Sequence, residues 1–349
     1  MATPIPHRPL LPGLYQVVPL GPDRIVVANG GRAVALSGAG FTARVGPLLA
    51  ALDGTSTAED LHLRFPEIAP AVLDGLAAKG LLVDAAPVSD RPSVAPQLTA
   101  VALPGAPSPA ESAAGLAAAT VTIFGCGAPG GAVAVLLTKA GVGRLVVADD
   151  GAVGEGDLAV SPILERSDVG CPRAEAVARH CRDAGGDAAG VAVGQSWDFR
   201  PDVVLLELGY DEVGTAAADH CLAAGLSYLV HTQDALEASV GPFVGPGGFP
   251  CHQCLAARRL SHVAHSEEYL AYRQQRATTS PRPTAYLAAQ VALVAGLASI
   301  EVLRALLDAE PSSAGALLSL DLGGYSARRE VLLPVPGCRG CARAGRERP

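Results

Sequence analysis

Four of the eight cysteines form two pairs whose spacing is suited to metal binding. The first pair is Cys251 and Cys254, and the second, near the end of the chain, is Cys338 and Cys341. Two thiols at C-x-x-C spacing reach one ion from a tight turn, and two such turns complete the tetrahedral geometry of closed zinc sites. The alternatives are a redox dithiol, for which a thioredoxin-like helix start is missing, and free buried thiols. We therefore predict zinc bound by all four cysteines, with no open position for catalysis.

A glycine-rich loop is the second feature that could do chemistry. Gly125, Gly127 and Gly130 match G-x-G-x-x-G between a predicted strand and a predicted helix, and Asp149 ends the next strand. Such glycines let the backbone approach a phosphate at the helix N-terminus, while the acid accepts hydrogen bonds from a ribose. The loop predicts nucleotide binding without separating NAD from ATP. The alternative is a turn that only packs the helix on the sheet.

The elements around this loop predict a Rossmann-like α/β domain over residues 119–341. The pattern from residue 119 is strand, turn, helix and strand, which is typical of a right-handed βαβ unit in a parallel sheet. Further elements are expected as buried strands at 191–193, 203–207 and 228–231 and as helices at 173–184 and 211–224. The tail at 342–349 is expected to be disordered.

The first 84 residues predict a separate, winged-helix-like α+β domain. Short segments rich in Val and Ile, joined by turn sequences, are followed by three helical patterns. The expected strands are 15–19, 24–28 and 32–36, and the expected helices are 41–52, about 56–65 and 69–79. Ser56 and Glu59 fit a capping box at the second helix. Residues 85–118 are rich in Pro, Ala and Ser and predict a linker.

Composition narrows the classes of function. The net charge of −8, from 26 basic and 34 acidic residues, provides no basic surface for nucleic acid or for an anionic membrane. The N-terminus does not resemble a signal peptide, and polar residues interrupt the apolar stretch at 287–307. Eight cysteines are too few for a disulfide scaffold in a chain of 349 residues. We therefore expect a soluble, cytoplasmic protein.

The glycine loop and the sequence after it resemble the ThiF/MoeB family, the ATP-dependent adenylating enzymes related to ubiquitin activators. The segment GCGAPGGAVAVLLTKAGVGRLVVADDGAV, followed by SDVGCPRAEA, carries this resemblance, which covers roughly residues 119–341. It implies ATP phosphates at the three glycines, a ribose at Asp149 and a four-cysteine zinc site. It also makes an NAD-dependent dehydrogenase the weaker alternative.

Three positions depart from the pattern that the resemblance implies. The family's catalytic arginine falls on Val160, its phosphate-contacting lysine on Cys171, and its magnesium-handling aspartate on Leu206 or Glu207. Each cationic contact to the developing negative charge is worth on the order of 3 kcal/mol, so two or three losses cost about 10⁵-fold or more in rate. We expect no catalytic residue and doubtful ATP binding. The alternative is an active adenylating enzyme in which other residues have taken over these roles and activate a peptide carboxylate.

A second segment carries a narrower resemblance. SVGPFVGPGGFPCHQCL, at 239–255, is similar to a stretch of the ThiF-like proteins of thiazole/oxazole-modified microcin and thiopeptide pathways. Those proteins do not adenylate and are partners of a YcaO-type cyclodehydratase, and their winged-helix-like domain binds the leader of a ribosomally made precursor peptide. The resemblance implies a leader-binding adaptor in antibiotic biosynthesis and a homodimer. The helix around 284–307 could serve the core or the dimer.

A leader peptide could add as an extra strand to the edge at 32–36, with apolar side chains in a groove beside the third helix. Arg32 and Lys79 would bind leader carboxylates. The predicted peptide contacts are Arg32, Ala33, Val34, Ala35, Leu36, Val72, Leu73, Leu76 and Lys79. A DNA-reading helix needs basic residues, and the helix at 69–79 offers only Lys79. The alternative is that the apolar residues, Val72 and Leu76 among them, belong entirely to the core.

Overall fold

The computed structural model of the chain divides into two compact units, residues 1–114 and 115–349. The residues that it describes are 4–29, 32–85, 109–191, 201–207, 212–234, 236–246, 248, 250–278, 287–321, 323–324 and 326–343. Both units have the element types that the sequence predicts.

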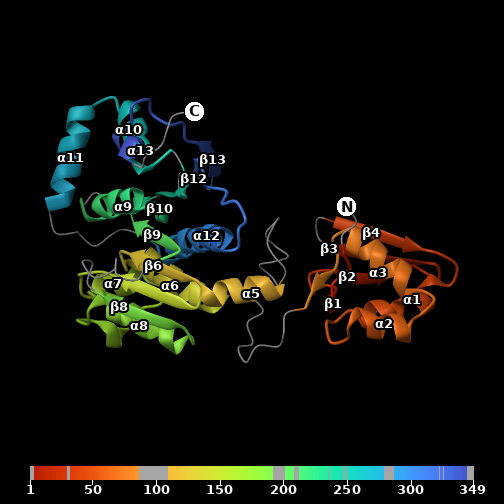
Figure 1. The fold of residues 1–349 in the computed structure, drawn as a ribbon. Helices are drawn as coiled ribbons and strands as arrows, with labels where there is room; N and C mark the ends of the chain where they lie inside the picture. Colours follow the sequence, from red (N-terminus) through yellow and green to blue (C-terminus); the bar gives the residue numbers. More distant parts are fainter. Residues whose placement is uncertain are drawn as a thin grey trace. The chain divides into compact units, whose positions relative to one another are not determined.

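The N-terminal unit combines a small antiparallel sheet with three helices (Figure 1). Its elements are β1 (Pro9–Leu10), β2 (Gln16–Pro19), β3 (Arg24–Asn29), β4 (Arg32–Ser37), α1 (Phe41–Ala50), α2 (Ala58–Arg64), α3 (Ala69–Ala78) and β5 (Val83–Asp84). Strand β4 lies at one edge of the order β2-β3-β4, and Asn29 pairs with Arg32 across the hairpin. The three predicted strands and three predicted helices are therefore present, and the winged-helix assignment stays a prediction.

The capping box of helix α2 is formed by Thr57 and Asp60, and not by the expected Ser56 and Glu59. The hydroxyl of Thr57 accepts a hydrogen bond from the N–H of Asp60 at 3.1 Å, and the Asp60 carboxylate accepts one from the N–H of Thr57 at 3.0 Å. The capping box thus lies one residue further along the chain. The side chains of Asp and Glu both fit this motif, so the pattern alone did not decide the register.

The C-terminal unit is built on a mixed sheet with the order β13-β12-β11-β10-β9-β6-β7-β8. Its strands are β6 (Thr120–Phe124), β7 (Arg144–Ala148), β8 (Asp187–Val191), β9 (Val203–Glu207), β10 (Ser227–Asp234), β11 (Glu237–Val244), β12 (Ala316–Asp321) and β13 (Ser326–Val331). The five strands from β10 to β8 are parallel, which confirms the Rossmann-like α/β class. Strand β8 ends where the strand expected at 191–193 begins, because all five of its residues pair with β7.

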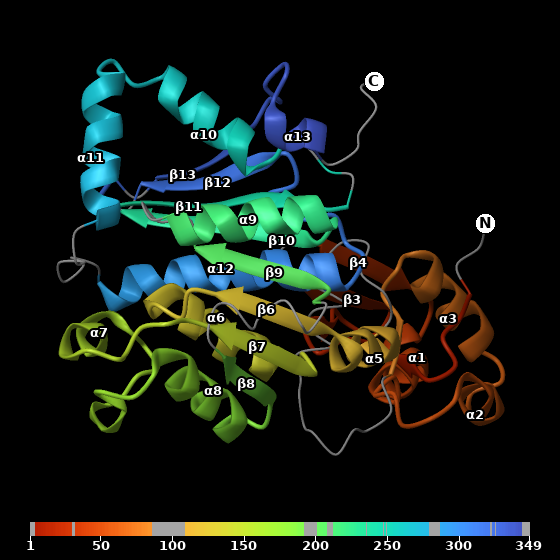
Figure 2. The ribbon, with the colours of Figure 1, turned by 60° about the vertical axis from the view of Figure 1, so that its left-hand side comes forward.

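Helices cover both faces of this sheet (Figure 2). The helices that follow β6 in the chain are α6 (Ala128–Ala140), α7 (Glu155–Val160), α8 (Arg173–Asp183), α9 (Glu212–Ala224), α10 (His252–Ser261), α11 (Ser266–Thr278), α12 (Ala288–Leu306) and α13 (Arg339–Arg343). Val204 and Leu206 of β9 pack with Ala218 of α9, whereas a Cβ on Gly130 of α6 would meet Ile123 of β6. Since side chains alternate along a strand, α6 and α9 lie on opposite faces.

The linker expected over 85–118 is too long at its C-terminal end. Residues Pro109–Ala118 form helix α5, and both Ser112 and Leu116 are completely buried. The Ala-rich sequence favours a helix, and the carbonyl of Leu116 accepts a hydrogen bond from Gly143. Residues 86–108 lie outside the described residues. At the other end, residues 342 and 343 of the tail expected to be disordered belong to α13, and 344–349 are outside the described part.

Helix α12 is long and apolar enough to cross a membrane by length and composition alone. It is the single such helix found among the described residues, and it packs on α6 and on strands β9 to β11. One of its sides, which includes Val291, Val294 and Val302, is completely buried. These contacts place one side of α12 in the core of the C-terminal unit.

Candidate metal centre and glycine-loop site

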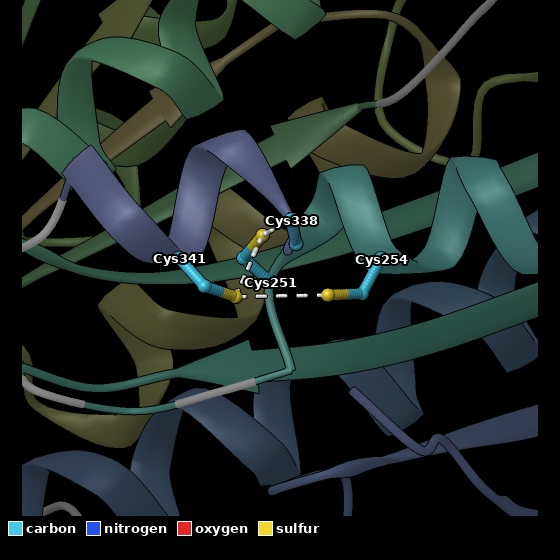
Figure 3. Close-up of side chains that lie close together, drawn as sticks. All are labelled: Cys251, Cys254, Cys338 and Cys341. Atoms are coloured by element: carbon cyan, nitrogen blue, oxygen red, sulfur yellow. Dashed lines mark hydrogen bonds between the residues drawn. The ribbon is translucent and has the colours of Figure 1, made fainter. Parts of the chain in front are cut away.

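The four predicted cysteines converge on one point (Figure 3). Their Sγ atoms all lie within 4.8 Å of one another. The distances are 3.7 Å from Cys251 to Cys338, 3.6 Å from Cys254 to Cys341 and 3.5 Å from Cys251 to Cys341. Four thiolates at about 2.3 Å from a tetrahedral zinc ion would lie roughly 3.8 Å apart. The donor set and its spacing therefore fit zinc.

Two short helices hold these thiols. Cys251 is the N-cap of α10 and Cys254 lies in its first turn. Cys338 directly precedes α13, and Cys341 lies within that helix. A Cβ on Gly340 would lie 3.0 Å from the Sγ of Cys251, so a residue with a side chain would crowd the cluster. The sequence predicts the ligands, and the structure adds this glycine.

Burial has its clearest effect on the two thiols of the first cysteine pair. It raises the pKa of Cys251 and Cys254 above the usual thiol value. Burial also opposes ionisation of Cys338, but N–H donors of Cys341 and Gly340 lower the pKa of that thiol. Metal ligation requires thiolates, and a divalent cation bound here would stabilise four of them at this separation.

His252 lies between Cys251 and Cys254 at the start of α10, and its side chain is 3% exposed. Its Nδ1 lies 2.9 Å from the hydroxyl of Tyr228, and its Nε2 lies 3.0 Å from Oδ1 of Asp219 on α9. The partners come from α9 and β10, which the local pattern does not reveal. His252 therefore ties the cysteine cluster to the sheet and does not serve as a ligand.

The glycine loop has the predicted strand-turn-helix form. Gly125 has φ +89°, a conformation that favours glycine. Gly127 is the N-cap of α6. A Cβ on Gly130 would lie 2.0 Å from the carbonyl oxygen of Gly125, so a side chain there would collide with the backbone. The loop thus brings the start of α6 close to β6, as in nucleotide-binding folds.

Asp149 lies beside this loop, and both of its carboxylate oxygens are engaged. Oδ2 accepts the N–H of Cys126 at 2.7 Å, and Oδ1 accepts the N–H of Gly151 at 2.7 Å. The guanidinium of Arg173 donates to Oδ1 at 3.0 Å and to Asp157 at 3.3 Å. A ribose at Asp149 would compete with these contacts.

Arg173, the first residue of α8, provides a positive charge beside Asp149. Burial opposes its charge, but Asp149 and Asp157 raise the pKa of its guanidinium above the usual value. Its position depends on how α8 packs beside β7, so no local motif indicates it. The nearest sequence signal is its place directly after Pro172.

The three positions that depart from the family pattern differ in their surroundings. Val160 is 6% exposed and packs with Ala128 and Val291 in an apolar cluster. Cys171 is partly buried. Leu206 is completely buried.

Glu207, the other residue considered for the strand-end acid, ends β9 beside the glycine loop. A Cβ placed on Gly127 would lie 3.2 Å from its Oε2. The sequence left open whether Leu206 or Glu207 takes the position of the family's aspartate. Of these two residues, Glu207 is the one whose side chain reaches the loop.

The predicted peptide groove is only partly an exposed surface. Leu73 and Leu76 of α3 are completely buried and Val72 is 9% exposed, so these side chains belong to the core. A peptide could not reach Leu73 or Leu76 in the folded unit, which corrects that part of the prediction. Val34 and Leu36 of β4 pack partly against the same core. Ala33, Ala35 and Lys79 are exposed.

His231 is a buried polar residue that the sequence does not single out. It lies on β10, opposite Glu207 on β9 and Val240 on β11. It is 1% exposed, and among the described residues neither ring nitrogen has a hydrogen-bond partner. Burial lowers the pKa of its imidazole to about 4. The ring is therefore neutral at pH 7.

This pKa predicts a pH-dependent stability. The unfolded chain protonates His231 near pH 6.5 and the folded chain only near pH 4, so the unfolded state gains protons first. As the pH falls from 6.5 to 4, His231 should therefore lower the free energy of unfolding by about 3 kcal/mol. Denaturant unfolding of the protein and of His231→Gln, compared at both pH values, measures this difference. An equal loss in the variant would contradict it, and the exposed His262→Gln is the control.

The sequence model of the ThiF family matches residues 105–339. A search of curated proteins gives no match. Three similar solved structures share the fold. The microcin C7 biosynthetic enzyme MccB with N-formylated MccA is 16% identical, with a TM-score of 0.73 over 95% of this chain and 99% of that one.

The second is E. coli MccB with ATP, at 16% identity and a TM-score of 0.69, over 95% of this chain and 99% of that one. The third, PaaA, is 17% identical, with a TM-score of 0.59 over 75% of this chain and 91% of that chain. At these identities, the likeness establishes a shared fold.

Proposed function

Because the chain belongs to the ThiF family, we propose that it acts in the biosynthesis of a ribosomally made peptide natural product. It binds the leader of a precursor peptide and presents it to a modifying enzyme, without adenylating the peptide itself. The fold shared with MccB, a microcin C7 biosynthetic enzyme for which a complex with N-formylated MccA is known, supports a role in such a pathway.

One observation carries the non-catalytic part of this proposal. Adenylation needs cations on the phosphates, and Arg173, which the structure brings to the loop, already pairs with Asp149 and Asp157. Val160, at the position of the family's arginine, lies in an apolar cluster. The described residues of the loop therefore provide acids in place of phosphate ligands.

The leader-binding part rests on the free edge of β4. No described strand pairs with this edge. A peptide that adds there gains backbone hydrogen bonds. Ala33 and Ala35 are small and exposed, and the exposed Lys79 offers a positive charge for leader carboxylates, as does the sequence of β4 at its first residue, Arg32. The edge, rather than a deep groove, is the proposed source of affinity.

A YcaO-type cyclodehydratase of a thiazole/oxazole pathway is the proposed partner, and the cytoplasm is the proposed compartment. Both come from the resemblance of residues 239–255. Zinc is the proposed ion of the cysteine cluster. In that role it holds α10 and α13 together and takes no part in chemistry, because four protein ligands leave no open position.

We also propose a homodimer. Leu136 of α6 is 40% exposed, and Leu293 and Ile300 of α12 are each 47% exposed on helices that pack side by side. A second copy that covered this apolar face would remove it from water. Sedimentation of the intact protein tests this state, and a monomer at micromolar concentration would contradict it.

Pyrophosphate exchange tests the absence of adenylation. We expect no exchange above background when the zinc-loaded protein, Mg²⁺-ATP and precursor peptide are combined, because losing two or three cationic contacts costs about 10⁵-fold or more in rate. An active ThiF-family enzyme serves as the positive control. Exchange that is lost in Asp149→Asn would overturn the proposal.

The second candidate is an active adenylating enzyme. The retained glycine loop and the fold shared with an MccB structure that contains ATP favour it. In that case Arg173 would have to leave Asp149 and contact a phosphate. Replacement of Arg173 by Ala would then abolish exchange.

A further inference from the structure

The carboxylate of Glu207 lies beside the glycine loop. A Cβ placed on Gly127 would lie 3.2 Å from Oε2 of Glu207, and one on Gly125 would lie 3.3 Å from the same oxygen. The Glu207 carboxylate therefore lies against the backbone of both glycines. In a nucleotide-binding loop that backbone faces the phosphates. Here the space left by the missing side chains is taken by a residue of the same chain.

The fold directs Glu207 to this place. Phe124 of β6 pairs with Leu206 of β9, so Glu207 lies level with Gly125 at the carboxyl ends of the two strands. The N-terminus of α6, which begins at Ala128, carries a partial positive charge that attracts a carboxylate. Burial raises the pKa of the Cys126 thiol in this loop, and the charges of Asp149 and Glu207 add to the effect. Both acids thus act on the loop.

We propose that Glu207 occupies the phosphate-facing side of the glycine loop and thereby excludes nucleotide polyphosphates. This inference rests on the proposed non-catalytic function and gives it a cause. A polyphosphate would bring several negative charges to this carboxylate, while Arg173 remains engaged by Asp149 and Asp157. At the effective dielectric constant of such sites, one such charge weakens binding on the order of tenfold to hundredfold.

Calorimetric titration of ATP into the full-length, zinc-loaded protein tests this, with and without Mg²⁺. In Glu207→Gln, which keeps the shape and loses the charge, we expect ATP affinity to rise about tenfold or more. In Glu207→Asp the charge stays but retracts by one methylene, so the gain should be smaller. Glu330→Gln on β13 is the matched control, because Glu330 is exposed on another strand. Zinc content and far-UV circular dichroism report whether each variant folds.

Equal affinities of the original protein and Glu207→Gln would overturn the inference. So would Mg²⁺-dependent binding that is lost in Glu207→Gln, because Glu207 would then support a nucleotide through a cation. If Glu207→Gln does not fold, unchanged affinity in Glu207→Asp has the same meaning. The proposed function is judged separately: pyrophosphate exchange by the original protein would overturn the adaptor, whereas ATP binding by Glu207→Gln without exchange leaves it intact.

Discussion

Replacement of Cys254 by Ser should release one equivalent of zinc and unfold the C-terminal unit. The hydroxyl is a poor zinc ligand, and three thiols would remain crowded without the charge that holds them together. Structural zinc supplies on the order of 10 kcal/mol of apparent folding free energy in small zinc proteins. The total stability of a domain is about 5–15 kcal/mol, so the loss of even half of the zinc contribution, about 5 kcal/mol, would approach the whole stability of the unit. Metal analysis by mass spectrometry and thermal unfolding measure the two effects.

The matched control is Cys171→Ser. Cys171 is partly buried and lies outside the cluster, so this variant should keep its zinc and nearly all of its stability. A chelator should reproduce the Cys254→Ser result in the original protein. Full zinc content and an unchanged melting temperature in Cys254→Ser would show that these thiols do not hold the metal.

Deletion of residues 1–84 should abolish leader binding. The deleted segment contains β4 and its exposed residues, and it lies entirely within the first of the two compact units. We expect affinity for a labelled leader peptide, measured by fluorescence anisotropy, to fall at least about hundredfold, since every backbone hydrogen bond of the added strand is lost. The truncated protein should retain its zinc, which shows that it is folded.

Point variants locate the binding surface within that unit. Lys79→Glu reverses an exposed charge and should weaken leader binding about tenfold. Leu63→Asp changes a side chain that is 77% exposed on α2 and should leave binding unchanged. Leader binding that survives the deletion would mean that the C-terminal unit recognises the peptide.

The features that depend on local sequence were the predictable ones. The cysteine cluster follows from spacing and from the rarity of thiols, and the glycine loop follows from a strand, a turn and a helix in order. The edge strand β4 and the hairpin before it follow from β-branched residues around Asn29. Each of these signals lies within a few residues along the chain.

The features that the sequence could not supply depend on packing between distant segments. Arg173 meets Asp149 because α8 packs next to β7, and His252 is buried because Asp219 of α9 reaches it. Leu73 and Leu76 have the spacing of a helix face, but that spacing does not state whether the face meets a peptide or the core. Only the tertiary structure settles such cases.

The contact between Gly130 and Gly125 limits what a motif can say about the history of a protein. Any side chain at 130 would collide with the carbonyl of Gly125, whether or not a nucleotide ever binds. Selection for folding alone is therefore enough to keep this glycine after the chemistry is gone. A descendant that had abandoned ATP would still display the fingerprint of its ancestors. Assignments of activity in such lineages are safer when they start from the charged residues around the loop than from the glycines in it.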